Sequence, residues 1–208
     1  MLVVGLGNPG QKYAHTRHNI GRDILLEIIN RGDFSDIQND RYAHSLVSDG
    51  YMAKARVVPR EITDKTGWLI IALPETFMNR SGEAVRELMK KYTLTYEDVI
   101  VVYDDIDLPF GKVKISKDRG DGGHNGVRSV VGHMGTKNFI RIRVGICPID
   151  ESGEKSKPHK DVVSRYVLGR LSPKETEALA AITQRVEEAL ECLSLRGVEE
   201  AMNSINEG

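Results

Sequence analysis

The feature that most constrains the fold is a regular alternation of strand-like and helix-like apolar patterns along the chain. Short runs rich in Val and Ile, bounded by turn residues, are typical of strands. Apolar residues that recur at intervals of three and four are typical of amphipathic helices. The strand-like runs are residues 2–6, 43–47, 53–58, 68–73, 99–103, 111–115 and 139–146. This alternation predicts an α/β protein with three α/β/α layers, in which helices cover both faces of a largely parallel or mixed sheet.

Helix-like stripes occur in four places, at residues 20–28, 85–92, 127–134 and 179–193. The last helix has the clearest boundaries. Ser172 is a suitable N-cap, Pro173 fits the first helical position, and Glu175 completes a capping box. Gly197 is a plausible stop. We therefore expect a C-terminal helix that begins at about residue 173.

Length and composition favour one domain over residues 1–208. The chain is 40% hydrophobic and 28% charged, which is ordinary for a globular protein. The polar stretch 150–160 predicts a mobile loop. The two cysteines form no C-x-x-C pair, so neither a disulfide framework nor a zinc site is expected. The absence of a run of 18 apolar residues and of a signal-like N-terminus predicts a cytoplasmic protein without membrane association.

Charge is unevenly distributed although the formal net charge is only −1. Residues 112–143 hold eight Lys or Arg and two Asp, whereas residues 171–208 hold three Lys or Arg and eight Glu. A basic middle and an acidic tail are compatible with one localised anionic partner, or with chance clustering on a solvated surface.

A glycine motif follows the first predicted strand. Residues 5–10 read GLGNPG and match the spacing G-x-G-x-x-G of a dinucleotide-binding turn. In that motif a helix opens within the glycines and meets the pyrophosphate. Here Pro9 interrupts, and the helical stripe begins only near Ile20. A crevice loop that carries polar side chains is therefore favoured over a nicotinamide or flavin site.

A histidine and an acidic cluster follow two of the predicted strands. His18 ends a polar loop, and Asp104, Asp105 and Asp107 come after the run 99–103. In open α/β sheets, crevices at the carboxyl ends of strands bind ligands. Asp104 could orient His18 and raise its basicity, the three carboxylates could hold a divalent cation, or the cluster could be a solvated turn.

Two further loops contain candidate binding groups. In residues 76–82, the amide of Asn79 could bind a substrate carbonyl or cap the next helix, and Met78 could line a groove or belong to the core. Residues 120–126 are glycine-rich and precede a helix, as in anion-binding sites. Basic residues flank this loop, which favours an anion site over a flexible loop with an Asn cap; they are Lys114, Lys117, Arg119 and Arg128.

Motifs of other hydrolases are missing from the sequence. It holds neither a G-x-S-x-G elbow nor an H-E-x-x-H metal motif. The available polar groups are His, Asp and several Asn. This set suits attack by a water molecule that a histidine activates, with amides to steady an oxyanion.

Taken together, these segments resemble the bacterial peptidyl-tRNA hydrolase family nearly end to end. The similar segments are residues 4–10 with Tyr13, then 16–21, 76–82, 103–109, 122–126, 141–146 and 166–169. The resemblance implies a single α/β/α domain with a mixed, twisted central sheet. It also implies a monomeric enzyme that cuts the ester between a peptide and the 3′-terminal ribose of tRNA, without cofactor or metal. Ser116 departs from the pattern, because a basic residue is common there.

The resemblance also implies roles for individual residues. His18 would be the general base and Asp104 its orienting partner, with Asn8 and Asn79 beside the scissile ester. The substrate-binding residues would be Tyr13, Phe77, Met78, Asn79 and Asn125. The residues facing tRNA would be Lys114, Lys117, Gly123, His124, Asn125 and Arg143.

Three other functions compete with this interpretation. An RNA-binding protein on the same scaffold could have lost hydrolysis, although His18, Asp104 and Asn79 are all present. A dinucleotide oxidoreductase would use the glycine motif. A metal-dependent hydrolase would use the three carboxylates, and a chelator would then abolish its activity.

Overall fold

A computed structural model describes residues 1–31, 42–48, 51–56 and 69–207 of the chain, with only the backbone described for 42–48 and 51–56. Its centre is a five-stranded sheet with the strand order β4-β1-β5-β7-β6. The strands are β1 (Leu2–Gly5), β4 (Ile70–Ala72), β5 (Val99–Pro109), β6 (Val113–Ser116) and β7 (Ile140–Cys147). All neighbours pair in parallel except β6 and β7, so the prediction of a mixed sheet is confirmed.

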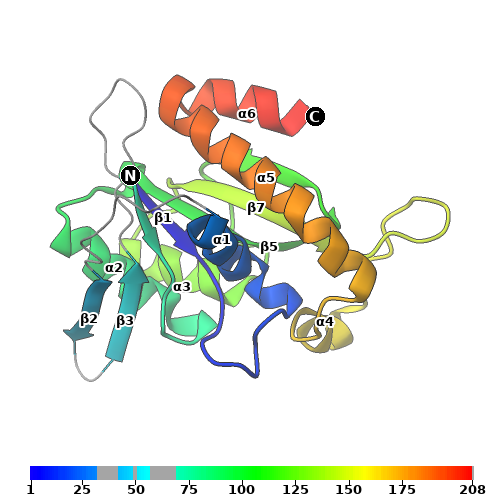
Figure 1. The fold of residues 1–208 in the computed structure, drawn as a ribbon, viewed down its shortest axis with the longest axis horizontal. Helices are drawn as coiled ribbons and strands as arrows, with labels where there is room; N and C mark the ends of the chain where they lie inside the picture. Colours follow the sequence, from blue (N-terminus) through cyan, green and yellow to red (C-terminus); the bar gives the residue numbers. More distant parts are fainter. Residues whose placement is uncertain (32–41, 49–50, 57–68, 208) are drawn as a thin grey trace.

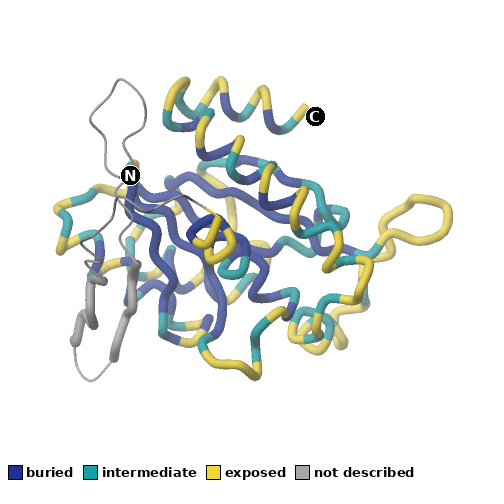
Figure 2. The backbone as a smooth tube through the Cα atoms, in the orientation of Figure 1, coloured by how far each residue is buried: buried dark blue, intermediate teal, exposed yellow. Residues whose placement is uncertain are grey.

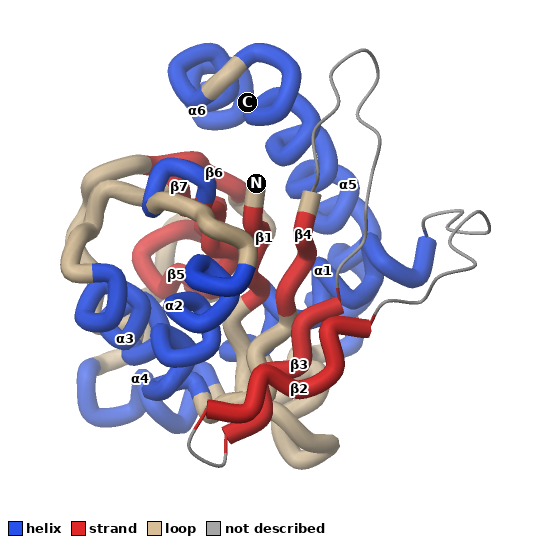
Figure 3. The backbone as a smooth tube through the Cα atoms, turned by 90° about the vertical axis from the view of Figure 1, so that its left-hand side faces the viewer, coloured by secondary structure: helices blue, strands red, loops and turns tan. Residues whose placement is uncertain are grey.

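Helices cover both faces of this sheet, as the three-layer prediction requires (Figures 1 and 3). One face carries α1 (Ile20–Arg31), α5 (Pro173–Arg196) and α6 (Val198–Glu207). The other carries α2 (Ser81–Lys91) and α3 (Asn125–Met134). Figure 2 shows the strands as the buried layer between them.

Strand β5 explains why the core divides in two. Side chains alternate between the faces of a strand. Ile100 and Val102 pack into the cluster beneath α1 and α5, whereas Val101 and Tyr103 pack into the cluster beneath α2 and α3. A continuous apolar run in the sequence is therefore a strand that is buried on both faces.

Helix α1 lies unusually close to β5, and Gly21 makes this possible. A side-chain carbon at Gly21 would lie 2.2 Å from the carbonyl oxygen of Val102. A short 3-10 helix, η1 (Arg17–Asn19), immediately precedes α1. The close contact at Gly21 therefore brings η1 to the carboxyl half of β5, where the acidic cluster lies.

Several boundaries differ from those predicted. Strand β5 continues through the acidic cluster, because Asp104 and Asp105 pair with Val144 and Gly145 of β7. Asp104 therefore lies within the strand, not in the first position after it. Of the two alternatives for Asn79, capping of α2 is not observed, because Arg80 occupies the N-cap, and a 3-10 helix, η2 (Met78–Arg80), leads into it.

Two helices were not predicted. Helix α4 (Lys160–Val167) follows the polar stretch, and α6 follows Gly197, which does end α5. A further 3-10 helix, η3 (Tyr96–Asp98), precedes β5. The capping box of Ser172 and Glu175 is present as predicted. The start of the 150–160 stretch is folded back by a bridge between Ile149 and Lys155, and its predicted mobility stays a prediction.

Two of the predicted strands form a second, smaller sheet. Strands β2 (Tyr42–Ser48) and β3 (Tyr51–Arg56) pair with each other in a two-stranded antiparallel sheet. The end of the predicted run 53–58 and the beginning of 68–73 lie outside the described residues. Among the described helices, none is long and apolar enough to cross a membrane.

Candidate active site

His18 and Asp104 meet in one pocket, as predicted. Nδ1 of His18 lies 2.8 Å from Oδ1 of Asp104, and both side chains are almost fully buried. Burial alone would lower the pKa of His18, but the Asp104 carboxylate outweighs it and the pKa is raised. Burial also opposes the charged form of Asp104, but its two histidine neighbours hold the pKa of this carboxyl well below its usual range. A carboxylate at Nδ1 leaves Nε2 as the basic nitrogen of His18.

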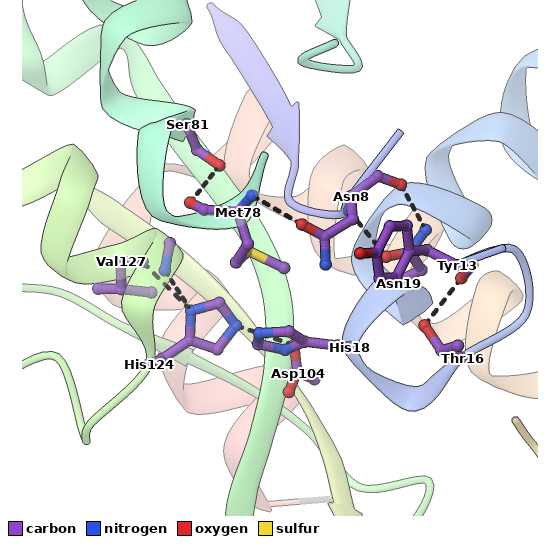
Figure 4. A network of polar contacts seen from close by, with 11 residues as sticks. Asn8, Tyr13, Thr16, His18, Asn19, Met78, Ser81, Asp104, His124 and Val127 are labelled. Atoms are coloured by element: carbon purple, nitrogen blue, oxygen red, sulfur yellow. Dashed lines mark hydrogen bonds and ion pairs between the residues drawn. The ribbon is translucent and has the colours of Figure 1, made fainter. Parts of the chain in front are cut away.

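His124 is a second partner of the same carboxylate oxygen, and the sequence analysis missed this contact. Nε2 of His124 lies 2.8 Å from Oδ1 of Asp104. Nδ1 of His124 accepts hydrogen bonds from the backbone N–H groups of Gly126 and Val127, at 3.1 and 3.2 Å, and so caps α3 (Figure 4). Because Nδ1 accepts, the ring proton is on Nε2, and His124 donates to Asp104.

Asn8 is also buried, and its backbone is fixed by Asn19. The backbone N–H of Asn8 donates to Oδ1 of Asn19 at 2.8 Å, and Nδ2 of Asn19 donates to the carbonyl of Asn8 at 2.9 Å. Oδ1 of Asn8 accepts from the backbone N–H of Met78 at 2.9 Å. These contacts orient the side-chain NH₂ group of Asn8 as a donor in the pocket that Asn8 and the two histidines line (Figure 4).

A pocket of about 560 Å³ contains these groups together with the other predicted substrate-binding residues. Phe77 is about half exposed and meets the ring of Tyr13 edge-on, with ring centroids 6.3 Å apart. Asn79 and Asn125 are exposed at the pocket lining, whereas Met78 is buried there. Helix α4 supplies one wall through Lys160, Val163, Ser164 and Val167.

Each of the three carboxylates of the acidic cluster has its own basic partners. Asp104 binds the two histidines, and Oδ2 of Asp105 accepts from Nε of Arg143 at 2.7 Å. Asp107 forms an ion pair with Lys157. These carboxylates therefore do not converge on one point, which argues against the cation site considered from the sequence.

The described residues contain one other set of ligand atoms that could hold a metal, on His18, Asp104 and His124. A histidine that binds a metal usually donates its second ring N–H to a carbonyl or carboxylate. In His124 that nitrogen accepts two backbone N–H groups instead, so a metal on Nε2 would require an imidazolate. The tautomer of His124 thus favours a hydrogen-bonded triad of His18, Asp104 and His124 over a metal site.

The residues predicted to face tRNA lie in two different environments. Gly123 and Asn125 are exposed, and Lys114 and Lys117 are partly exposed. Arg143 lies opposite Lys114 on the neighbouring strand, but it is buried and donates to Asp105, so its contact with tRNA stays a prediction. The side chain of His124 is turned toward Asp104, as described above.

Comparisons with known proteins identify the family. A family model described as peptidyl-tRNA hydrolase matches residues 2–208. A peptidyl-tRNA hydrolase of Halalkalibacterium halodurans is 37% identical over 205 residues, which cover 99% of each chain. One from a Geobacter species is 40% identical over 207 residues, which cover 99% of this chain and 97% of the relative.

The chain belongs to the peptidyl-tRNA hydrolase family.

The fold of this peptidyl-tRNA hydrolase family member agrees with a solved structure of the family. The crystal structure of peptidyl-tRNA hydrolase from Acinetobacter baumannii is 31% identical and has a TM-score of 0.73, with 99% of this chain and 93% of that chain covered. The resemblance inferred from the sequence is therefore confirmed. The roles of single residues in the pocket are a separate question, which their geometry addresses.

Proposed function

We propose that this chain hydrolyses the ester between a peptide, or an N-blocked aminoacyl group, and the 3′-terminal ribose of tRNA, and so recycles tRNA from prematurely released peptidyl-tRNA. Family membership supports the substrate and the reaction. The single observation that carries the mechanism is the contact between Nδ1 of His18 and the Asp104 carboxylate inside the pocket.

In the first step, Nε2 of His18 takes a proton from a water molecule as the water oxygen attacks the ester carbonyl carbon. Asp104 holds the Nδ1 proton and stabilises the imidazolium that forms. The carbonyl π electrons move to the oxygen, which becomes an oxyanion. The NH₂ group of Asn8, oriented by Met78 and Asn19, is the donor best placed to stabilise that charge.

In the second step, the tetrahedral intermediate collapses and the bond to the ribose oxygen breaks. His18 returns its proton to that oxygen, so the free ribose hydroxyl and the peptide carboxylic acid form and the base is regenerated; the acid then loses its remaining proton to solvent. An alkoxide is a poor leaving group, and the imidazolium supplies the proton that it needs. We assign Asn79 and Asn125 to binding the peptide backbone at the exposed part of the pocket.

His124 restrains Asp104 through Nε2, while its other ring nitrogen, Nδ1, caps α3. Its donated hydrogen bond occupies Oδ1 beside that of His18 and keeps the buried carboxylate ionised. Because the His124 ring is itself held by the backbone of α3, the position of Asp104 depends on the start of that helix. No metal ion has a part in this scheme.

The apolar and basic surroundings suit the two halves of the substrate. Tyr13, Phe77 and Met78 offer an apolar wall for peptide side chains. Lys114, Lys117, Gly123 and Asn125 would contact tRNA phosphates, which gives affinity without sequence reading. We further propose that the enzyme acts in the cytoplasm as a single-domain monomer.

The test is release of N-blocked aminoacyl groups from tRNA in the presence of EDTA, by the wild type, His18→Ala and a control, His133→Ala. His133 lies on α3 and is not among the residues that line the pocket. We expect fast release by the wild type and the control, and release slower by about 10² or more with His18→Ala. A fully active His18→Ala variant, or wild-type release abolished by EDTA, would reject the mechanism. Binding of tRNA without release would instead favour an RNA-binding protein.

A further inference from the structure

Helix α4 forms one wall of the pocket but has little core of its own. None of its eight residues is fully buried, although Tyr166 and Val167 pack partly against the main core. Its first turn follows the polar 150–160 stretch. A helix with so few buried contacts needs other interactions to hold it in one position.

The contacts that hold α4 converge on Arg17, the residue before His18. The guanidinium of Arg17 lies 4.3 Å from the ring centroid of Tyr166, in the last turn of α4. The hydroxyl of Tyr166 donates to the carbonyl of Ile146 at the end of β7, at 2.7 Å. Stacking of a guanidinium on an aromatic ring that is fixed at its far end makes a stable contact.

Glu175 fixes the other side of the guanidinium. Its two carboxylate oxygens accept from Nε and Nη2 of Arg17 at 2.9 and 2.6 Å, and both side chains are about 15% exposed. The same carboxylate accepts from the backbone N–H of Ser172 in the capping box of α5. Burial opposes the charged form of Glu175, but the Arg17 hydrogen bonds prevail and its pKa is lowered.

The backbone reinforces this contact. The N–H of Arg17 donates to the carbonyl of Gly169 at 3.0 Å, and the N–H of Leu171 donates to the carbonyl of His15 at 2.9 Å. Thr16 and Arg170 form an antiparallel bridge between these bonds. The segment that leads to His18 is therefore paired with the connector between α4 and α5.

We propose that Arg17 is a positioning residue that joins the His18 segment, α4 and the start of α5 into one unit, so that the general base and the α4 wall of the pocket are placed together. The kinetic part of this inference rests on the proposed function, whereas the structural part does not. Without the Arg17 side chain, the backbone bonds still pair the His18 segment with the connector, but α4 loses its side-chain contact with that segment. We expect kcat to fall because the base is less well placed, and KM to rise because the pocket wall is displaced. Misplacement of about 1 Å can cost a reaction about 10²-fold.

The variants that test this are Arg17→Gln, Arg17→Lys, Glu175→Gln and the double variant Arg17→Gln/Glu175→Gln. Glutamine also completes a capping box, so Glu175→Gln keeps the start of α5. Lysine keeps the charge but loses the planar fork and much of the stacking. The control is Arg196→Gln, which removes the exposed Arg196–Glu200 ion pair at the end of the same helix, α5, outside the pocket lining.

Two measurements are needed, hydrogen–deuterium exchange and steady-state kinetics. We expect Arg17→Gln to speed amide exchange in residues 160–169 and to lower kcat/KM by about 10- to 10²-fold, with a fall in kcat and a rise in KM. Arg17→Lys should recover part of this loss. The double variant should be no worse than the worse single variant, because both remove one interaction. The pH midpoint of kcat should stay in place, since Asp104 is the charged partner of His18.

Two results would overturn the proposal. One is a folded Arg17→Gln protein in which residues 160–169 exchange as in the wild type. The other is a double variant whose loss of kcat/KM is the sum of the two single losses. If Arg17→Gln fails to fold, Arg17→Lys and Glu175→Gln decide, and wild-type exchange and kinetics in both would overturn it. If the wild-type protein releases no peptide, the proposed function fails, yet the exchange data still show whether Arg17 holds α4.

Discussion

One carboxylate oxygen of Asp104 is hydrogen-bonded to two imidazole rings, those of His18 and His124. Both histidine contacts are 2.8 Å long, and the two rings lie with centroids 4.7 Å apart. A buried carboxylate without partners would take up a proton. Here burial raises and the two histidines lower the pKa of Asp104, and the histidines prevail. The cost of burying this charge is thus offset by two hydrogen bonds, each of which also orients a ring.

Replacing Asp104 by Asn should impair the base in two measurable ways. The carboxylate raises the pKa of His18 above its ordinary value of about 6.5. In the proposed mechanism His18 acts as a base when neutral, so wild-type kcat/KM should rise with pH through this raised pKa. In Asp104→Asn the pKa falls, so the rise should shift to lower pH. The plateau should fall by about 10²–10⁴-fold, because the ring loses its fixed tautomer. A pH–rate profile of both proteins measures the shift and the plateau.

Asp107→Asn is the matched control for this variant. Asp107 is three residues further along the same strand, but it pairs with Lys157 and does not line the pocket. Its profile should coincide with that of the wild type. An Asp104→Asn profile with an unchanged midpoint would mean that Asp104 does not set the pKa of His18.

The pair of His18 and Asp104 was predicted because the sequence pattern places both residues after strands whose carboxyl ends would meet at one edge of the sheet, although Asp104 in fact lies within β5. The contact of His124 with Asp104 was missed, because Asn125 beside His124 is the better N-cap by residue type. Whether His124 turns its ring inward depends on the direction of α3 relative to β5. That direction is a property of packing, which residue type and spacing do not encode.

At the scale of elements, the contact of α1 with β5 determines whether His18 reaches Asp104. Gly21 lies in the first turn of α1, three residues after His18, and faces the carbonyl of Val102. Asp104 is two residues beyond Val102 on the same strand. The distance between the two site residues is therefore set by how closely this helix approaches this strand.

Gly21→Ala should lower both stability and activity. The new carbon would lie 2.2 Å from the Val102 carbonyl oxygen, so α1 must move away from β5. Overpacking of this kind costs about 1–3 kcal/mol of unfolding free energy. The same movement carries His18 away from Asp104, so kcat should fall in the protein that remains folded. Urea unfolding and single-substrate kinetics measure the two effects.

Gly132→Ala controls for the loss of a helical glycine. Gly132 lies within α3, and a side-chain carbon there would meet no atom within 4 Å. Alanine should therefore stabilise the protein by about 0.5–1 kcal/mol, through helix propensity alone. Equal effects of the two substitutions on stability would show that the contact at Val102 is easily relieved.

The elements that periodicity missed are those that owe their position to other parts of the chain. Helix α4 spans only eight residues, none of them fully buried, and it depends on the contact of its Tyr166 with Arg17. Helix α6 follows a glycine that does end α5, and its Asn206 amide bonds both the N–H and the carbonyl of Ile115 at the free edge of β6. Such contacts are distant in sequence, whereas strands and helices buried in the main core were predicted from local patterns.

At the scale of the whole molecule, a net charge of −1 conceals a separation of charge between the basic stretch 112–143 and the acidic residues 171–208. Part of the basic charge is used internally. Arg141 is buried and donates to the carbonyls of Gly120 and Lys137, and so holds the two segments that flank α3. Lys114 and Lys117 remain partly exposed and are available to a polyanion.

The contribution of these lysines is best measured by salt dependence, because each phosphate contact releases condensed counterions. We expect KM for peptidyl-tRNA to rise with salt as a straight line in a log–log plot, while kcat changes little, since neither lysine lines the pocket. The double variant Lys114→Gln/Lys117→Gln should raise KM and reduce the slope by about 0.7–0.9 per lysine. Arg31→Gln, which removes an exposed charge at the end of α1, should leave the slope unchanged. If both variants reduce the slope equally, the attraction depends on total charge and tRNA has no preferred face. If only the lysine variant reduces the slope, tRNA binds beside β6.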